Sequence, residues 1–204
     1  MSPGFKFLLV GTVGGEFFLP WVLAKFYPGY DGKTMPMSAL GNPKSPVRRV
    51  YNVWLLWLGG FLLVTAARFF QEDFSKAPVL SVLRLICLSV FAVGAGLVAG
   101  LFSVGETKDE KAAAAVIHGI GAAIGFMALL FYPLLEAVAG FTQGRELFGW
   151  SSLGAFLLAL VFFVCFVMAD KPEFQHTPLA WEGLWQRLTL FFMYVPLLCR
   201  AANV

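Results

Sequence analysis

The chain has 204 residues, of which 59% are apolar and 13% are charged, and its mean hydropathy is +0.77. Soluble domains are about 45–50% apolar and about 25% charged, so this composition excludes a soluble domain, a disordered tail and a small disulfide-rich secreted scaffold. The net charge of +3 is too small for a nucleic-acid partner, whose binding depends on many phosphate contacts. We therefore expect an integral membrane protein.

Six apolar stretches are long enough to cross a bilayer, which takes about 20 residues of helix for roughly 30 Å of hydrocarbon. Backbone groups inside a membrane must be hydrogen-bonded within the segment, so such runs predict helices, and they lack the alternating pattern of barrel strands. The predicted fold is all-α, a single transmembrane domain over residues 1–204 with six transmembrane helices. The predicted spans are 5–26, 50–70, 79–102, 113–138, 147–168 and 180–200.

The loop after the first span, residues 27–49, is much longer than the other connections. Four prolines within it exclude a helix, and loops of this length are usually functional or disordered. Ser38 and Asn42 are natural turn-forming residues, because their side chains can bond nearby backbone. We expect a partly ordered loop folded over one end of the bundle, with Ser38 and Asn42 as candidate ligand-binding residues.

A basic cluster lies directly before the second span and consists of Lys44, Arg48 and Arg49. Each basic residue near an anionic membrane surface contributes about 1 kcal/mol, so we expect these three to contact lipid phosphates. The alternative is a cluster that only sets topology. In that case the positive-inside rule would place the first loop in the cytoplasm. If the cluster binds lipid instead, its charges say nothing about topology, so the orientation stays open.

Glu16 lies near the middle of the first span. A charged residue at the centre of a membrane helix costs about 2.5–3.5 kcal/mol and often marks a functional site. Two interpretations remain: a ligand or proton site, or a hydrogen-bonded residue that holds helices together. In either case we expect Glu16 to point into the bundle, where it is protonated or bonded to a hydroxyl, to the indole of Trp54 or Trp57, or to Arg187.

The fourth span carries polar groups at both ends of one face. His118 is followed on this face by Gly121 and Gly125, and Glu136 lies five turns further on, about 27 Å away at 1.5 Å per residue. The face is expected to point inward, with His118 and Glu136 as candidate ligand-binding residues too far apart to act as a catalytic pair. We expect the glycines to let the first helix approach closely. The alternative for His118 is a hydrogen bond across helices.

Arg187 lies about seven residues into the last span. Its depth makes it a candidate ligand-binding residue, and we expect it to pair with Glu16 or Glu136. Three further arginines lie toward helix ends, where long side chains extend to the membrane interface: Arg68, Arg84 and Arg200.

No motif indicates an enzyme, a metal site or a cofactor. The chain has only two histidines, too few for a haem held between helices or a zinc site, and it contains no nucleophile elbow, phosphate-binding loop or dinucleotide motif. We expect no catalytic residues, no metal and no cofactor, although a Ser–His pair brought together by folding stays open. The expected partners are membrane lipids, a hydrophobic small molecule and other membrane subunits.

Several short motifs carry a resemblance to a known family. The first loop reads Met-Ser-Ala-Leu-Gly-Asn-Pro-Lys-Ser-Pro over residues 37–46, Tyr51-Asn52 opens the second helix, and Gly-Leu-Trp-Gln-Arg-Leu over residues 183–188 opens the last. With the histidine near the start of helix four, these motifs resemble the prokaryotic six-helix membrane family called domain of unknown function 998. More distantly they resemble the damage-regulated autophagy modulator group. The family usually has an acidic residue where this chain has Ala39. The resemblance implies six helices but no activity.

Three functions fit the sequence. The first is binding of a lipid or other hydrophobic small molecule in an intramembrane cavity, because a chain with 22 Phe and few polar groups near the bilayer midplane matches the usual lining of such pockets. The second is a proton-coupled small-molecule transporter that uses Glu16, of which broken helices would be the sign. The third is a structural subunit of a larger membrane complex. An intramembrane enzyme has no motif in its favour.

Overall fold

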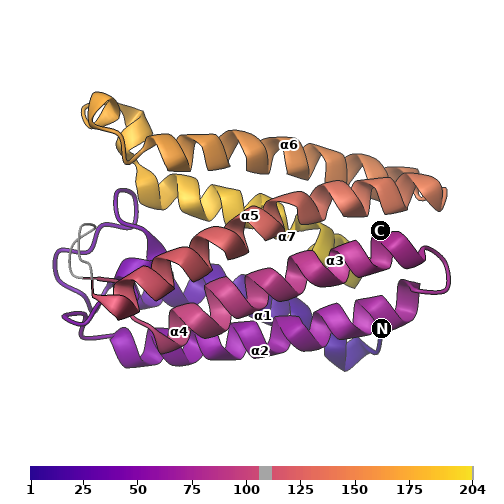
Figure 1. The fold of residues 1–204 in the computed structure, drawn as a ribbon, viewed down its shortest axis with the longest axis horizontal. Helices are drawn as coiled ribbons and strands as arrows, with labels where there is room; N and C mark the ends of the chain where they lie inside the picture. Colours follow the sequence, from indigo (N-terminus) through magenta and orange to yellow (C-terminus); the bar gives the residue numbers. More distant parts are fainter. Residues whose placement is uncertain (106–111, 204) are drawn as a thin grey trace.

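The computed structural model describes residues 1–105 and 112–203. The described residues form an elongated bundle of long helices that run side by side (Figure 1), with no strand among them. The chain order of the long elements is α1 (Pro3–Ala24), α2 (Arg48–Asp73), α3 (Pro78–Phe91) continued by η2 (Ala92–Val98) and α4 (Ala99–Leu101), α5 (Ala113–Thr142), α6 (Glu146–Met168) and α7 (Glu182–Ala202).

Short helical turns occupy the connections. They are η1 (Met37–Gly41) in the first loop, and η3 (Pro172–Phe174) and η4 (Pro178–Ala180) between α6 and α7. The long elements begin and end within a few residues of the predicted spans, apart from the fourth, which continues to Thr142.

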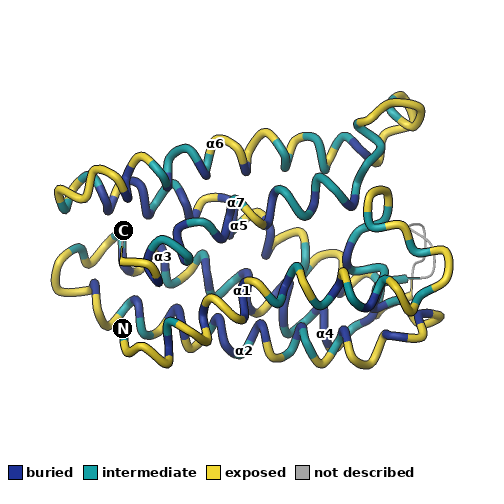
Figure 2. Tube along the Cα trace, turned by 180° about the vertical axis from the view of Figure 1, so that it is seen from behind, coloured by how far each residue is buried: buried dark blue, intermediate teal, exposed yellow. Residues whose placement is uncertain are grey.

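Five of the described helices are long and apolar enough to cross a membrane: α1, α2, the continuous segment Pro78–Leu101, α5 and α6. Large apolar side chains cover their outer surface, such as Phe7, Val79 and Leu147, each more than 70% exposed, and exposed positions run along the outside of the bundle (Figure 2). A surface of this kind suits a hydrocarbon solvent. The chain is therefore an integral multi-pass membrane protein.

Glycines set the position of the third span between its neighbours. A Cβ on Gly96 would lie 2.6 Å from the Cα of Gly59 on α2, and Gly94 lies against the carbonyl group of Gly121 on α5. Gly125, one turn on, lies against the same segment. The prediction that the first helix packs against the α5 glycines is therefore wrong. These glycines pack against η2, a π-helical segment whose own glycines allow the two backbones to approach closely.

The first loop is folded over one end of the bundle, as predicted, and it is firmly anchored there. Met37 and Leu40 are buried, and the backbone N–H of Met37 donates to the side-chain oxygen of Gln186 on α7 at 2.6 Å. Asn42 forms the expected turn, because its Oδ1 accepts from the backbone N–H of Lys44 at 2.8 Å. The Nδ2 of Asn42 also donates to the carbonyl oxygen of Gly105 at 3.0 Å, which ties the loop to the end of the third span.

Arg187 holds the other half of this loop. Its Nη1 donates to the carbonyl oxygens of Gly32 at 2.6 Å and Gly183 at 2.7 Å, and its Nη2 donates to the hydroxyl of Tyr30 at 2.7 Å. Burial raises the pKa of the Tyr30 hydroxyl, which therefore stays a neutral acceptor for the arginine. The predicted ion pair of Arg187 with a glutamate is wrong, because loop carbonyls take up its donors.

Candidate ligand-binding site

A cavity of about 620 Å³ lies inside the half of the bundle next to the first loop. All the long elements contribute to its wall, which is mostly apolar and includes the rings of Phe91, Phe126, Phe163 and Phe166. Its volume falls within the range of about 300–1,000 Å³ that is typical of small-molecule sites. A few polar side chains interrupt the apolar wall: Glu16, Ser38, Tyr51, His118, Asp170, Glu182 and Gln186.

Glu16 points into the bundle and lines this cavity, with 3% of its surface exposed. Its Oε2 accepts from the indole N–H of Trp54 at 2.7 Å, which confirms the predicted indole partner. Gly15 makes this bond possible, because a Cβ there would collide with the Trp54 ring. One turn earlier, Thr12 accepts from the indole of Trp57 at 3.4 Å. Glu16 thus joins α1 to α2 and also presents a carboxyl group to the cavity.

His118 also lines the cavity from α5 and is buried. Its Nδ1 lies 2.8 Å from the carbonyl oxygen of Phe102, at the end of the third span. Because a carbonyl oxygen can only accept, Nδ1 carries the hydrogen of this bond, and in the neutral ring Nε2 is then an acceptor. His118 therefore forms the hydrogen bond across helices that was expected as the alternative to ligand binding. Its ring nevertheless remains part of the cavity wall.

Four polar residues of the cavity wall were not among the predicted site residues: Tyr51, Asp170, Glu182 and Gln186. Tyr51 and Gln186 are buried and line the cavity from α2 and α7. They lay within the motifs that open the second and last helices, which was the only available signal. Of the predicted loop residues, Ser38 lines the cavity, whereas both ends of the Asn42 amide are bonded to backbone.

An ion cluster occupies the opposite end of the bundle and joins α2, α3, α5 and α7. Arg84 lies 3.0 Å from Glu136 and 3.2 Å from Asp73, and Arg200 lies 2.7 Å from Asp73 and 3.2 Å from Glu136. All four residues are buried. Two guanidinium groups and two carboxylates compensate one another here, so none of the charges is left alone in the apolar interior.

This cluster corrects two predictions. Arg84 and Arg200 do not extend to the interface, because their carboxylate partners lie inside the bundle. Glu136 does not reach the cavity, because these two arginines and the hydroxyl of Tyr132, which donates to it at 2.6 Å, take up its oxygens. Asp73 was missed, because in the sequence it belongs to the polar turn after the second span.

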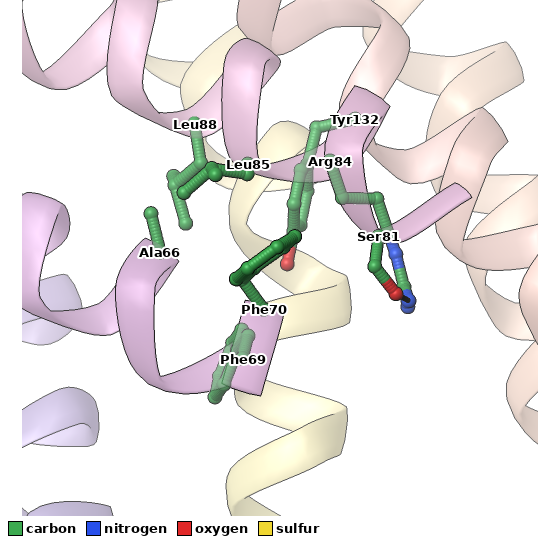
Figure 3. A pocket seen from close by; sticks show the side chains of 8 residues that line it. All are labelled: Ala66, Phe69, Phe70, Ser81, Arg84, Leu85, Leu88 and Tyr132. Atoms are coloured by element: carbon green, nitrogen blue, oxygen red, sulfur yellow. Dashed lines mark hydrogen bonds between the residues drawn. The ribbon is translucent and has the colours of Figure 1, made fainter. Parts of the chain in front are cut away.

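The pocket beside Arg84 and Tyr132 is too small for a ligand. Figure 3 shows Arg84 extending next to Ser81, with Phe69 and Phe70 nearby. The volume is about 10 Å³, which is the least space that a single water needs. We therefore assign the ion cluster a structural role in closing this end of the bundle.

The basic cluster lies on the surface at the first-loop end. Lys44, Arg48 and Arg49 are exposed, and the two arginines begin α2. Within residues 1–105 and 112–203, no group of three or more His, Cys, Asp or Glu side chains is placed to hold a metal ion.

The fold and the cavity thus define the class of protein: a multi-pass helical membrane protein with a mostly apolar internal cavity. Residues 13–203 match the family described as protein of unknown function (DUF998), and the chain belongs to this family. The named resemblance is therefore confirmed, while the more distant likeness to the damage-regulated autophagy modulator group stays a prediction. No curated protein and no solved structure matches the chain.

Proposed function

We propose that this protein binds a lipid or other hydrophobic small molecule in its intramembrane cavity. The observation that carries the proposal is the cavity itself, about 620 Å³ with a mostly apolar wall. Glu16, His118 and Gln186 are among the polar residues of this wall, and we expect them to orient the ligand, as in small-molecule sites where a few polar atoms fix orientation within an apolar wall.

We also propose that α7 makes a sixth membrane crossing. Its 21 residues reach about 30 Å at 1.5 Å per residue, and it runs back beside α6 (Figure 1). Two of its charged residues, Arg187 and Arg200, have partners. Arg187 donates to the first loop, and Arg200 belongs to the ion cluster. Both termini lie at the end opposite the first loop (Figure 1), which an even number of crossings requires.

The binding proposal is tested by native mass spectrometry of protein extracted mildly from its membrane. We expect one hydrophobic molecule to be retained per chain, and to be lost when Ala122→Trp fills the cavity from α5. Ile124→Trp is the matched control, because Ile124 lies on the same helix, is 56% exposed and is not part of the cavity wall. Equal retention by the two variants, or no retained molecule in the unchanged protein, contradicts the proposal.

A transporter that couples a small molecule to protons through Glu16 is a second candidate. The supporting observation is the interrupted third span, whose π-helical segment borders the cavity through Ala95, because irregular helices at a binding site are typical of transporters. Liposomes that contain the protein and an internal pH dye would acidify when the retained molecule is added, and Glu16→Gln would abolish the signal. A protein that copurifies at fixed stoichiometry would favour the structural-subunit alternative instead.

The exposed basic cluster supports a separate proposal, that Lys44, Arg48 and Arg49 bind anionic lipid head groups. Arg48 and Arg49 begin α2, Lys44 precedes them in the first loop, and all three are exposed, which supports contacts with lipid phosphates at the membrane surface. Neutralising all three residues would reduce the retention of phosphatidylglycerol, measured by mass spectrometry. Unchanged retention with the same topology would show that the cluster only sets orientation.

A further inference from the structure

The cavity reaches the outer surface of the bundle between α5 and α6. The two helices are packed closely at their shared turn, where Gly140 lies against Gly149, and they diverge toward the first-loop end (Figure 1). Side chains that line the cavity on this side are also exposed, with Val116 and Met127 at 46% and Val167 at 51%. Both helices are apolar enough to face hydrocarbon, so this opening leads into the bilayer.

Two buried polar groups of the cavity wall, Glu16 and His118, lie on α1 and α5. Glu16 belongs to α1, which packs on α2 and α7, and its carboxyl group accepts from Trp54. His118 donates through Nδ1 to a carbonyl group, so the ring presents an acceptor in its neutral form. Glu16 and His118 are therefore matched by a ligand that donates hydrogen bonds.

The buried and half-buried arginines of α3 and α7, which would attract an acidic ligand, make their contacts away from the cavity wall. The described cavity wall contains no Lys or Arg. Arg187, the arginine nearest to Gln186 along α7, donates into the first loop, and Arg84 and Arg200 are paired with carboxylates at the opposite end. An anionic head group in the cavity would meet the Glu16 carboxyl group, and none of the described lining residues is a basic side chain that could offset the repulsion.

From this geometry we propose that the cavity takes an amphipathic molecule with a hydrogen-bond-donating polar end, an amine or a hydroxyl group, and that the molecule enters sideways from the bilayer between α5 and α6. The polar end reaches Glu16, and the apolar part lies against the phenylalanine rings toward the opening. This proposal rests on the proposed binding function and specifies the class of ligand and its route.

The ligand class is tested with three probes of equal chain length: dodecylamine, dodecanol and dodecanoic acid. Each is titrated against the full chain in micelles of a neutral maltoside, and native mass spectrometry counts the bound molecules. Because hydrogen bonds to charged groups are the strong ones, we expect the amine to bind at least about tenfold more tightly than the acid. Glu16→Gln should bring the amine and the acid closer together, since it changes the acceptor but not the shape of the site.

Thr12→Val is the control for a merely structural effect, because Thr12 bonds an indole of α2 one turn from Glu16 and is not part of the cavity wall. It should leave the order of the three probes unchanged. Equal or tighter binding of the acid by the unchanged protein overturns the ligand class while leaving the binding function standing. No binding of any probe contradicts both.

The route is tested by the exchange of bound dodecylamine for its deuterated form, followed by mass. Ala123 is exposed on α5 and lines the opening, so Ala123→Trp should slow exchange several-fold relative to the Ile124→Trp control. Exchange at the same rate in the two variants overturns the lateral route.

Discussion

Glu16 has two roles in the structure, and substitutions can separate them. Glu16→Gln keeps an acceptor for the Trp54 indole and should change stability little. Glu16→Leu leaves this buried N–H without a partner, which costs about 1–3 kcal/mol. Thermal unfolding in detergent measures both effects. If Glu16→Gln leaves the retained ligand untouched and Glu16→Leu only lowers stability, Glu16 serves only to hold α1 to α2.

The ion cluster gives a second prediction at the scale of single residues. Arg84→Met leaves Glu136 and Asp73 with one guanidinium partner fewer, and breaking a buried pair typically costs about 3–5 kcal/mol. Arg84→Met combined with Glu136→Leu removes one charge of each sign, so it should cost less than the sum of the two single changes. Unfolding of the four proteins in a double-mutant cycle measures this difference, and strict additivity would contradict the assigned coupling.

At the scale of elements, the contact between α2 and the third span depends on single glycines. A Cβ on Gly59 would lie 2.6 Å from the carbonyl oxygen of Ala92, whereas a Cβ on the adjacent Gly60 meets no atom within 4 Å. Gly59→Ala should therefore destabilise the protein by about 1–3 kcal/mol. Gly60→Ala should be neutral or stabilising by about 0.5–1 kcal/mol, because alanine favours helix. Equal effects on unfolding temperature would refute this close approach.

The anchoring of the first loop gives a further prediction for an element. Gln186→Met removes the acceptor for the buried N–H of Met37 at nearly constant size, and the loop should become easier to cleave. Gln175→Met is the control, since Gln175 is exposed and its side chain donates to the carbonyl oxygens of Ala169 and Lys171 in its own connection. Limited proteolysis followed by mass spectrometry compares the two, and unchanged protection of the loop in Gln186→Met would show that this bond does not hold it.

For the whole molecule, the sequence predicted the elements better than their contacts. Hydropathy and length are local properties, so the long helices and the long first loop could be predicted from them. The central position of Glu16 correctly indicated an inward side chain, and its indole partner Trp54 was one of several predicted alternatives. Contacts between distant elements carry no such local signal. In the sequence Asp73 belongs to a polar turn, although in the structure it pairs with Arg200, which lies near the other end of the chain. The glycines of α5 likewise do not indicate which helix packs against them.

The most direct test of the binding function is an experimental structure of the protein in lipid nanodiscs. We predict that α5 and α6 remain apart toward the first loop, with elongated non-protein density that runs from this opening to the carboxyl group of Glu16. A structure in which α6 closes against α5 along its whole length, so that side chains fill the space of about 620 Å³, would contradict it.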